Sequence, residues 1–123
     1  MTLPFFVLMA GLMGAAGVAL AAAAAHAAPG AGLDSAAQIL LVHAVALLAG
    51  SAAVAAGLTW RPIAIAALMG FVLGALLFAG DVTLRAFVGH RLFPMAAPTG
   101  GSILILSWIA LSVAAAVRLV RGG

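Results

Sequence analysis

Cysteine, lysine, glutamate and tyrosine are all absent from this sequence of 123 residues. The lack of cysteine excludes disulfides, thiolate metal sites and a cysteine nucleophile. Charged residues make up only 6% of the chain and hydrophobic residues 67%, whereas a soluble domain carries about a quarter charged residues. A water-soluble protein of this composition would expose large apolar patches and aggregate. The composition therefore indicates a single domain that is embedded in the lipid bilayer. The bilayer is its expected partner.

The few charges are mostly positive, since five arginines stand against two aspartates and give a net charge of +3. The arginines are isolated near the ends of apolar runs, and no basic stripe interleaved with aromatic residues accompanies them. This arrangement excludes a nucleic-acid partner. It is typical of residues that set the orientation of membrane helices.

Four apolar segments each come close to the roughly 20 residues that cross about 30 Å of hydrocarbon as an α-helix. They lie at about residues 3–25, 36–58, 62–80 and 100–117. The sequence therefore predicts an all-α membrane protein, a compact bundle of four transmembrane helices in one domain over residues 1–123. In the long connection before the fourth span, we expect a short interfacial helix at about residues 82–88.

The first span also has a competing interpretation as a secretory signal. It ends in Ala25-His26-Ala27, which fits a small-x-small signal-peptidase site. However, no basic region precedes it, and its apolar run is longer than a usual signal core. We therefore interpret it as a retained helix.

Arginine counts predict the orientation of the four spans. An even number of spans places both termini and the turn before Pro62 on one side of the membrane. That side holds three arginines, whereas the other holds two that are offset by both aspartates. We therefore predict a multi-pass protein of the bacterial inner membrane with both termini in the cytoplasm. The arginines on the cytoplasmic side are Arg61, Arg118 and Arg121.

Small residues recur every four positions along three of the spans, a pattern that lets helix backbones approach closely in lipid. Gly70 and Gly74 form such a pair in the third span. Gly100 and Gly101 follow Pro98 at the start of the fourth span, and we expect them to serve packing or a turn. The other small-residue faces are Gly11, Ala15 and Ala19 in the first span, and Ala49, Ala53 and Gly57 in the second.

Ionisable groups inside a membrane are costly, so each one marks a candidate site. His26 ends the first span, Asp34 and Gln38 begin the second, and His43 lies deeper among apolar residues. Two interpretations remain open. In one, His26 and His43, with Asp34 as a further candidate ligand, bind a metal or haem or relay protons. In the other, His43 forms a hydrogen bond across helices that holds the bundle together. No cofactor is strongly implied, because two histidines without a carboxylate at ligand spacing make a weak metal site.

A second polar group lies in the last connection. Asp81 and Arg85 are four residues apart with the acid first, which favours an ion pair on a helix. The alternative is an entrance that attracts anions. No nucleophile elbow, catalytic triad or glycine-rich phosphate motif accompanies the serines and histidines, so we do not expect an enzyme.

A series of landmarks runs along nearly the whole chain. It begins with an alanine–histidine step that ends the first span, followed by a histidine before an alanine–leucine run in the second. A phenylalanine–small–glycine step ends the third span, and a proline–x–glycine–glycine turn opens the fourth, with a tryptophan seven residues later. These are Ala25-His26, His43, Phe78-Ala79-Gly80, Pro98-Thr99-Gly100-Gly101 and Trp108.

In these landmarks the sequence resembles the domain-of-unknown-function 423 family, small inner-membrane proteins of the YgdD type and their transmembrane protein 256-like relatives. The resemblance implies four helices in an inner membrane and no assigned activity. The sequence departs from the family pattern where Asp81 and Thr83 replace a serine and a tyrosine, and where Ala97 replaces a threonine.

Taken together, the small-residue faces and the sparse polar content predict a non-enzymatic structural or accessory subunit of a membrane complex or homo-oligomer. The alternative is a protein that binds a metal or haem at the periplasmic face, or transports a small solute, through His26 and His43. Asp34, Gln38, Asp81 and Arg85 are the other members of the polar cluster at that face.

Overall fold

The computed structural model describes residues 2–122, and within them the chain is all helical apart from three connections. All four helices are long and apolar enough to cross a membrane. They extend a few residues beyond the spans expected from the sequence at most ends. The helices are α1 (Thr2–His26), α2 (Leu33–Ala55), α3 (Arg61–Phe87) and α4 (Ala96–Val120).

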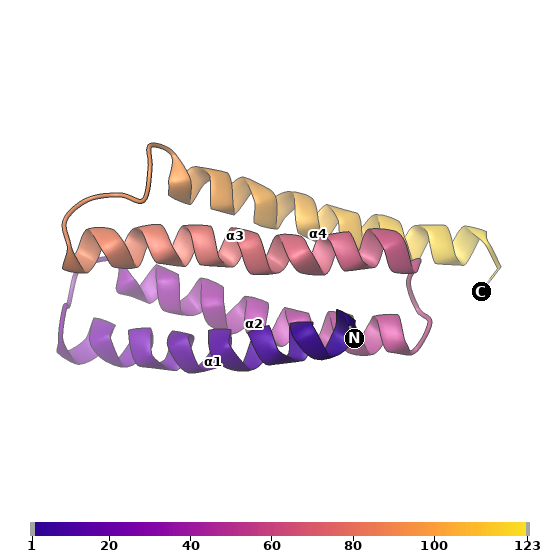
Figure 1. The fold of residues 1–123 in the computed structure, drawn as a ribbon, viewed down its shortest axis with the longest axis horizontal. Coiled ribbons are helices and arrows are strands. Elements are labelled where there is room, and N and C mark those ends of the chain that lie inside the picture. Colours follow the sequence, from indigo (N-terminus) through magenta and orange to yellow (C-terminus); the bar gives the residue numbers. More distant parts are fainter. Residues whose placement is uncertain (1, 123) are drawn as a thin grey trace.

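Successive helices run antiparallel (Figure 1). Both ends of the chain lie at the same end of the molecule as the turn between α2 and α3, whereas the other two connections lie at the opposite end. The prolines follow this pattern, because proline is tolerated in a first helical turn but disrupts a helix interior. Pro4, Pro62 and Pro98 stand in the first turns of their helices, and Pro29 and Pro94 lie in connections.

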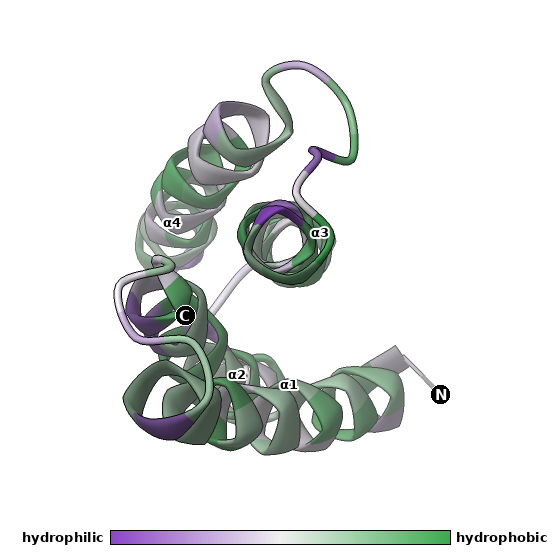
Figure 2. Cartoon of the chain, turned by 90° about the vertical axis from the view of Figure 1, so that its left-hand side faces the viewer, coloured by the Kyte–Doolittle hydropathy of each residue, from purple (hydrophilic) through white to green (hydrophobic). Residues whose placement is uncertain are grey.

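The bundle is open on one side. Helix α1 packs along α2, α2 along α3, and α3 along α4, but α1 and α4 make no close backbone contact in the described residues. Figure 2, which looks along the helices, shows α1 and α4 well apart. Short connections make helices that follow each other in the sequence pack together. In lipid no hydrophobic driving force brings α1 and α4 together to close the bundle. The compactness expected from the sequence is therefore limited to neighbouring helices.

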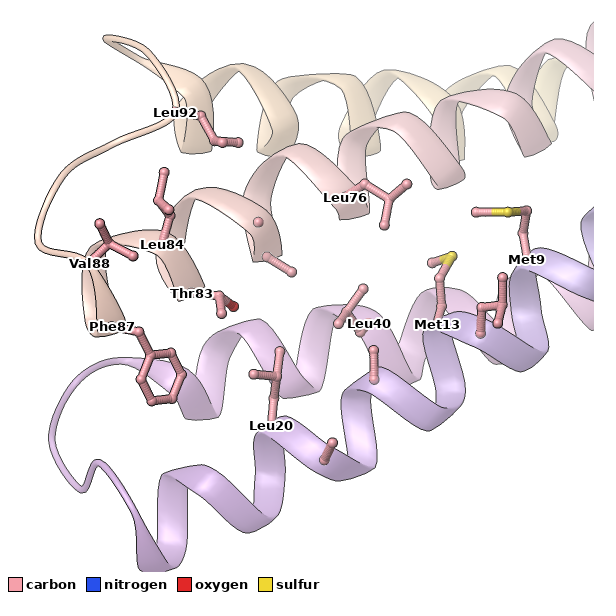
Figure 3. A pocket seen from close by; sticks show the side chains of 15 residues that line it. Met9, Met13, Leu20, Leu40, Leu76, Thr83, Leu84, Phe87, Val88 and Leu92 are labelled. Atoms are coloured by element: carbon pink, nitrogen blue, oxygen red, sulfur yellow. The ribbon is translucent and has the colours of Figure 1, made fainter.

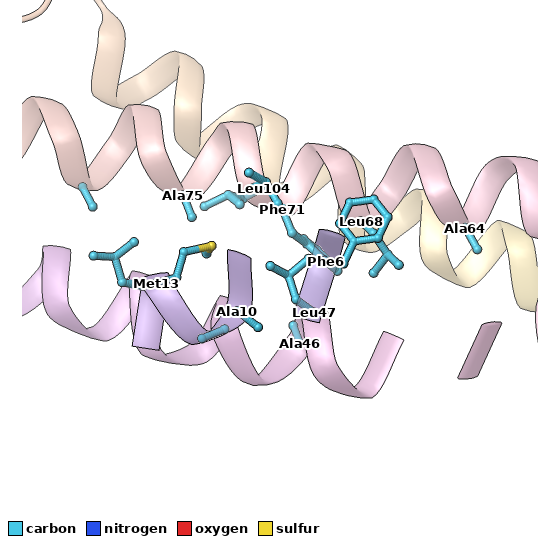
Figure 4. Close-up of a cluster of buried hydrophobic side chains, with 14 of the residues drawn as sticks. Phe6, Ala10, Met13, Ala46, Leu47, Ala64, Leu68, Phe71, Ala75 and Leu104 are labelled. Atoms are coloured by element: carbon cyan, nitrogen blue, oxygen red, sulfur yellow. The ribbon is translucent and has the colours of Figure 1, made fainter. Parts of the chain in front are cut away.

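Large apolar side chains fill the space between α1, α2 and α3 (Figure 4). Phe6 of α1, Leu47 of α2, and Leu68 and Phe71 of α3 are completely buried. Leu104 extends this core towards α4. The core therefore lies on the side of α3 and α2 that α1 covers, and α4 contributes little to it.

The third helix corrects one expectation from the sequence. Residues 82–87 do not form a separate interfacial helix but continue α3, which ends at Phe87. The glycine–aspartate step at Gly80 and Asp81 does not stop the helix, because the ion pair from Asp81 to Arg85 supports another turn. The stop is Gly89, whose φ of 91° lies in the left-handed region that commonly follows a helix end.

Glycine brings α3 and α4 together. A Cβ on Gly100 would lie 2.7 Å from the carbonyl oxygen of Gly74 and 2.7 Å from the backbone nitrogen of Phe78. A Cβ on Gly70 would collide with the hydroxyl of Ser107. Gly101, in contrast, has no neighbour within 4 Å of its Cβ position. Gly100 and Gly101 both lie inside α4 rather than in a turn, and the close contact falls on Gly100.

Candidate functional site

The imidazole of His43 is buried near the middle of the helices. His43 is only 4% exposed. It stands ten residues after the first residue of α2, or about 15 Å along the helix axis, which is roughly half the thickness of a bilayer core. Its Nδ1 lies 2.8 Å from the backbone carbonyl oxygen of Ile39, one turn earlier.

A tryptophan from α4 completes the surroundings of His43. Trp108 donates its Nε1–H to Nε2 of His43 at 3.1 Å. An indole N–H only donates, so Nε2 must accept and Nδ1 must carry the hydrogen that goes to Ile39. This assignment describes a neutral imidazole with both nitrogens engaged. The ring of Phe71 lies against both partners, with ring centroids 5.4 Å from His43 and 4.7 Å from Trp108.

This arrangement links three helices through side chains. His43 comes from α2, Phe71 from α3 and Trp108 from α4, and α2 and α4 have no close backbone contact with each other. Because Nδ1 of His43 carries the hydrogen and the lone pair of Nε2 accepts from Trp108, no lone pair of the ring is left to ligate a metal. Chemically, the group can act as an interhelical hydrogen bond surrounded by aromatic contacts.

The other predicted ligands do not approach His43. His26 ends α1 and is exposed, level with the start of α2, so it lies about 15 Å from His43 along the bundle axis. Asp34 and Gln38 are exposed near the start of α2. Among residues 2–122, no three histidine and aspartate side chains gather in a way that could hold a metal ion.

Asp81 forms the second polar group, at the end of the molecule away from the termini. Its carboxylate is almost completely buried, with 1% of the side chain exposed. One oxygen accepts the backbone N–H of Leu92 at 3.0 Å, and the other lies 3.4 Å from Nε of Arg85. The carboxylate thus fastens the connection between α3 and α4 onto α3. The predicted ion pair is present, and its acid also has a partner eleven residues away in sequence.

A wide apolar groove opens between α1 and α3 (Figure 3). Its volume is about 690 Å³, and Thr83 brings the one hydroxyl among its lining side chains. Met9 and Met13 line it from α1, and Leu76 and Phe87 line it from α3. The groove follows from the open arrangement, because α1 packs mainly on α2 and only slightly on α3.

Comparison with known proteins identifies a family for this chain. Residues 13–101 match the family model described as a protein of unknown function (DUF423). The chain belongs to the DUF423 family. No curated protein and no solved structure matches it. The DUF423 match runs from Met13 in α1 to Gly101 in α4, so it includes His43 and Asp81 but ends before Trp108.

The partner of His43 is what sequence reasoning missed in this DUF423 protein. Trp108 is 65 residues away from His43 in the chain, and no spacing rule connects the two. A signal was nevertheless present. Tryptophan in membrane helices favours the interfaces, and a buried indole N–H usually finds an acceptor. Trp108 is 43% exposed, but an indole N–H in the middle of a span finds no acceptor in lipid, so it needs a polar partner at its own depth, and His43 provides one.

Proposed function

We propose that this DUF423 protein is a non-enzymatic accessory subunit of a membrane complex or homo-oligomer, and that it meets its partner through the outer face of α1. What supports the proposal is a small-residue face on α1 that the fold leaves uncovered. Gly11, Ala15 and Ala19 are all exposed, and nothing lies within 4 Å of the Cβ position of Gly11. The similar pair on α3, Gly70 and Gly74, already packs on α4.

The way helices associate in lipid explains why this small-residue face could bind a partner. Lipid tails are as apolar as leucine, so association between membrane helices depends on close packing and on hydrogen bonds. Small residues on one face allow another backbone to approach closely. The apolar groove between α1 and α3 adjoins this face, since Ala19 also lines the groove. A transmembrane helix of the partner would therefore meet a hollow and a smooth small-residue surface next to each other.

The alternative function, binding of a metal, haem or small solute through His26 and His43, has no comparable support. His26 is at the end of α1, whereas His43 lies about two to three turns deeper and uses both its nitrogens internally. Asp34 is too far along α2 to join them both. We therefore favour the accessory role.

We further propose a bacterial inner-membrane location with both termini in the cytoplasm. The support is the arginine excess at the end of the molecule that holds the termini. There Arg118 donates its Nε–H to the carbonyl oxygen of Gly57 at 2.8 Å, and the Arg121 guanidinium lies 5.0 Å from the Trp60 ring centroid. Arg61 begins α3 at the same end.

Purification in a mild detergent tests the accessory role. Size-exclusion chromatography with light scattering should give a protein mass above that of one 12.0 kDa chain, from copies of itself or from a co-purifying subunit. Ala15→Leu should weaken this association, because overpacking a close contact costs about 1–3 kcal/mol. Ala116→Leu is the matched control, since Ala116 is also an exposed alanine within a span. A strictly monomeric, partnerless wild-type protein would refute the proposal.

A further inference from the structure

Arg85 near the end of α3 and Arg91 in the following connection have no part in the proposed accessory role, and their depth in the membrane suggests another one. Helix α3 contains 27 residues, so it is about 40 Å long and exceeds the roughly 30 Å of bilayer hydrocarbon. Arg61 at its start and Asp81 are twenty residues apart, which is about 30 Å. If Arg61 lies at one membrane surface, Asp81 lies at the other, and Arg85 reaches headgroup depth.

Two arginines share one cavity at this surface. A cavity of about 340 Å³ is lined by Asp81 and Arg85 of α3 and by Arg91 of the connection, and it extends to Ala97 and Pro98 at the start of α4. That is room for about ten water molecules, enough for a phosphate group.

The charges in this cavity do not balance. The lining residues bring two guanidinium groups and one carboxylate, so one positive charge remains. Nε of Arg85 lies 3.4 Å from Oδ2 of Asp81, and the Arg91 guanidinium forms no ion pair within the described residues. Guanidinium groups bind phosphate oxygens well because their N–H donors form a planar fork.

The start of α4 adds to the positive field. Its N-cap residue, Met95, provides no side-chain hydrogen bond. The N–H of Ala96 bonds to Phe93 and that of Thr99 to Met95, but the N–H of Ala97 has no acceptor among the turn and cap bonds of the described chain. Free N–H groups at a helix start attract anions, and Ala97 lines the same cavity as both arginines.

We propose that Arg85, Arg91 and the first turn of α4 form a phosphate-binding site at the membrane surface. A phosphodiester carries one negative charge, which equals the charge left over in the cavity. The depth of the site makes the headgroup of an anionic phospholipid the expected source of the phosphate, because a guanidinium at headgroup depth meets the phosphodiester groups of the surrounding lipid. The site is independent of the partner-binding face of α1.

Native mass spectrometry of the full chain in detergent tests the site with phosphatidylglycerol as the probe. Arg91→Gln should lower the fraction of protein that retains phosphatidylglycerol about fivefold, the effect of one arginine near a lipid surface. Arg91 is exposed, and its side chain forms no ion pair with the described residues. This variant should therefore fold, and its far-UV circular dichroism should match the wild type. Arg91→Lys should restore part of the binding, since it keeps the charge but loses the fork.

Arg61→Gln is the matched control, because it removes one exposed arginine at the other end of the molecule, where α3 begins. Equal losses for Arg91→Gln and Arg61→Gln, or no loss for either, would overturn the proposal. Adding inorganic phosphate distinguishes the two sources. Competition at millimolar phosphate would support the site with dissolved phosphate as its ligand, whereas resistance to competition would support it with the lipid headgroup as its ligand.

Discussion

Replacing Gly100 with alanine tests the close approach of α3 and α4 most sharply. The new Cβ would lie 2.7 Å from the carbonyl oxygen of Gly74 and from the backbone nitrogen of Phe78. Both neighbours are backbone atoms inside α3, so no side-chain rotation relieves the contact, and the two helices must separate. Overpacking of this kind costs typically about 1–3 kcal/mol, and the rigidity of the neighbours favours the upper part of that range.

Gly101→Ala provides the matched control. Gly101 is the next residue of the same helix, and nothing lies within 4 Å of its Cβ position. Both variants gain the same helix propensity, about 1 kcal/mol for alanine over glycine. This gain cancels when the two are compared, so the difference isolates the contact with α3. We expect Gly100→Ala to be about 2–3 kcal/mol less stable than Gly101→Ala.

The assay is reversible unfolding from mixed micelles with increasing sodium dodecyl sulfate, followed by far-UV circular dichroism. Gly101→Ala should unfold at the same or a higher detergent fraction than the wild type, and Gly100→Ala at a clearly lower one. Equal midpoints for the two variants would show that α3 and α4 do not pack as closely as the glycine contact requires.

Two further variants test the polar groups. Trp108→Phe leaves Nε2 of His43 without its donor and should lower the free energy of unfolding by about 0.5–2 kcal/mol in the same assay. If Trp108→Phe has an effect of similar size in a protein that already carries His43→Leu, the two side chains are not coupled. Asp81→Ala removes the acceptor of the Leu92 N–H and should raise hydrogen exchange at that amide, whereas Asp81→Asn keeps an acceptor oxygen and should raise it less. Equal protection in both variants would contradict the bond.

The number and order of the helices could be predicted from hydropathy, because a run of about 20 apolar residues has few stable alternatives to a membrane helix. The end of the third helix was predicted less well. Gly80 and Asp81 resemble a stop, but glycine inside a helix only weakens it, and the true end depends on the left-handed backbone of Gly89. The family assignment from the sequence landmarks is confirmed by the DUF423 match.

The surroundings of the polar residues were harder to predict, because they depend on how far one helix slides and rotates against another. The sequence indicated that His43 needs partners, but only packing decides that Trp108 rather than His26 lies at its depth. The burial of Asp81 has the same origin, since the connection folds back to bring Leu92 over it. Local spacing predicted the ion pair with Arg85 because that pair lies within one helix.

Single cysteines introduced at exposed positions near the start of α1, in each of the three connections and near the end of α4 test the central claim directly, because the natural chain has no cysteine. A membrane-impermeant maleimide applied to intact cells should label cysteines at the two connections away from the termini and leave the others unlabelled until the membrane is opened. The same accessibility on both sides of any one helix would contradict four membrane-spanning helices. The positions are Thr2, Ala31, Leu58, His90 and Leu119, of which Ala31 and His90 should react in intact cells.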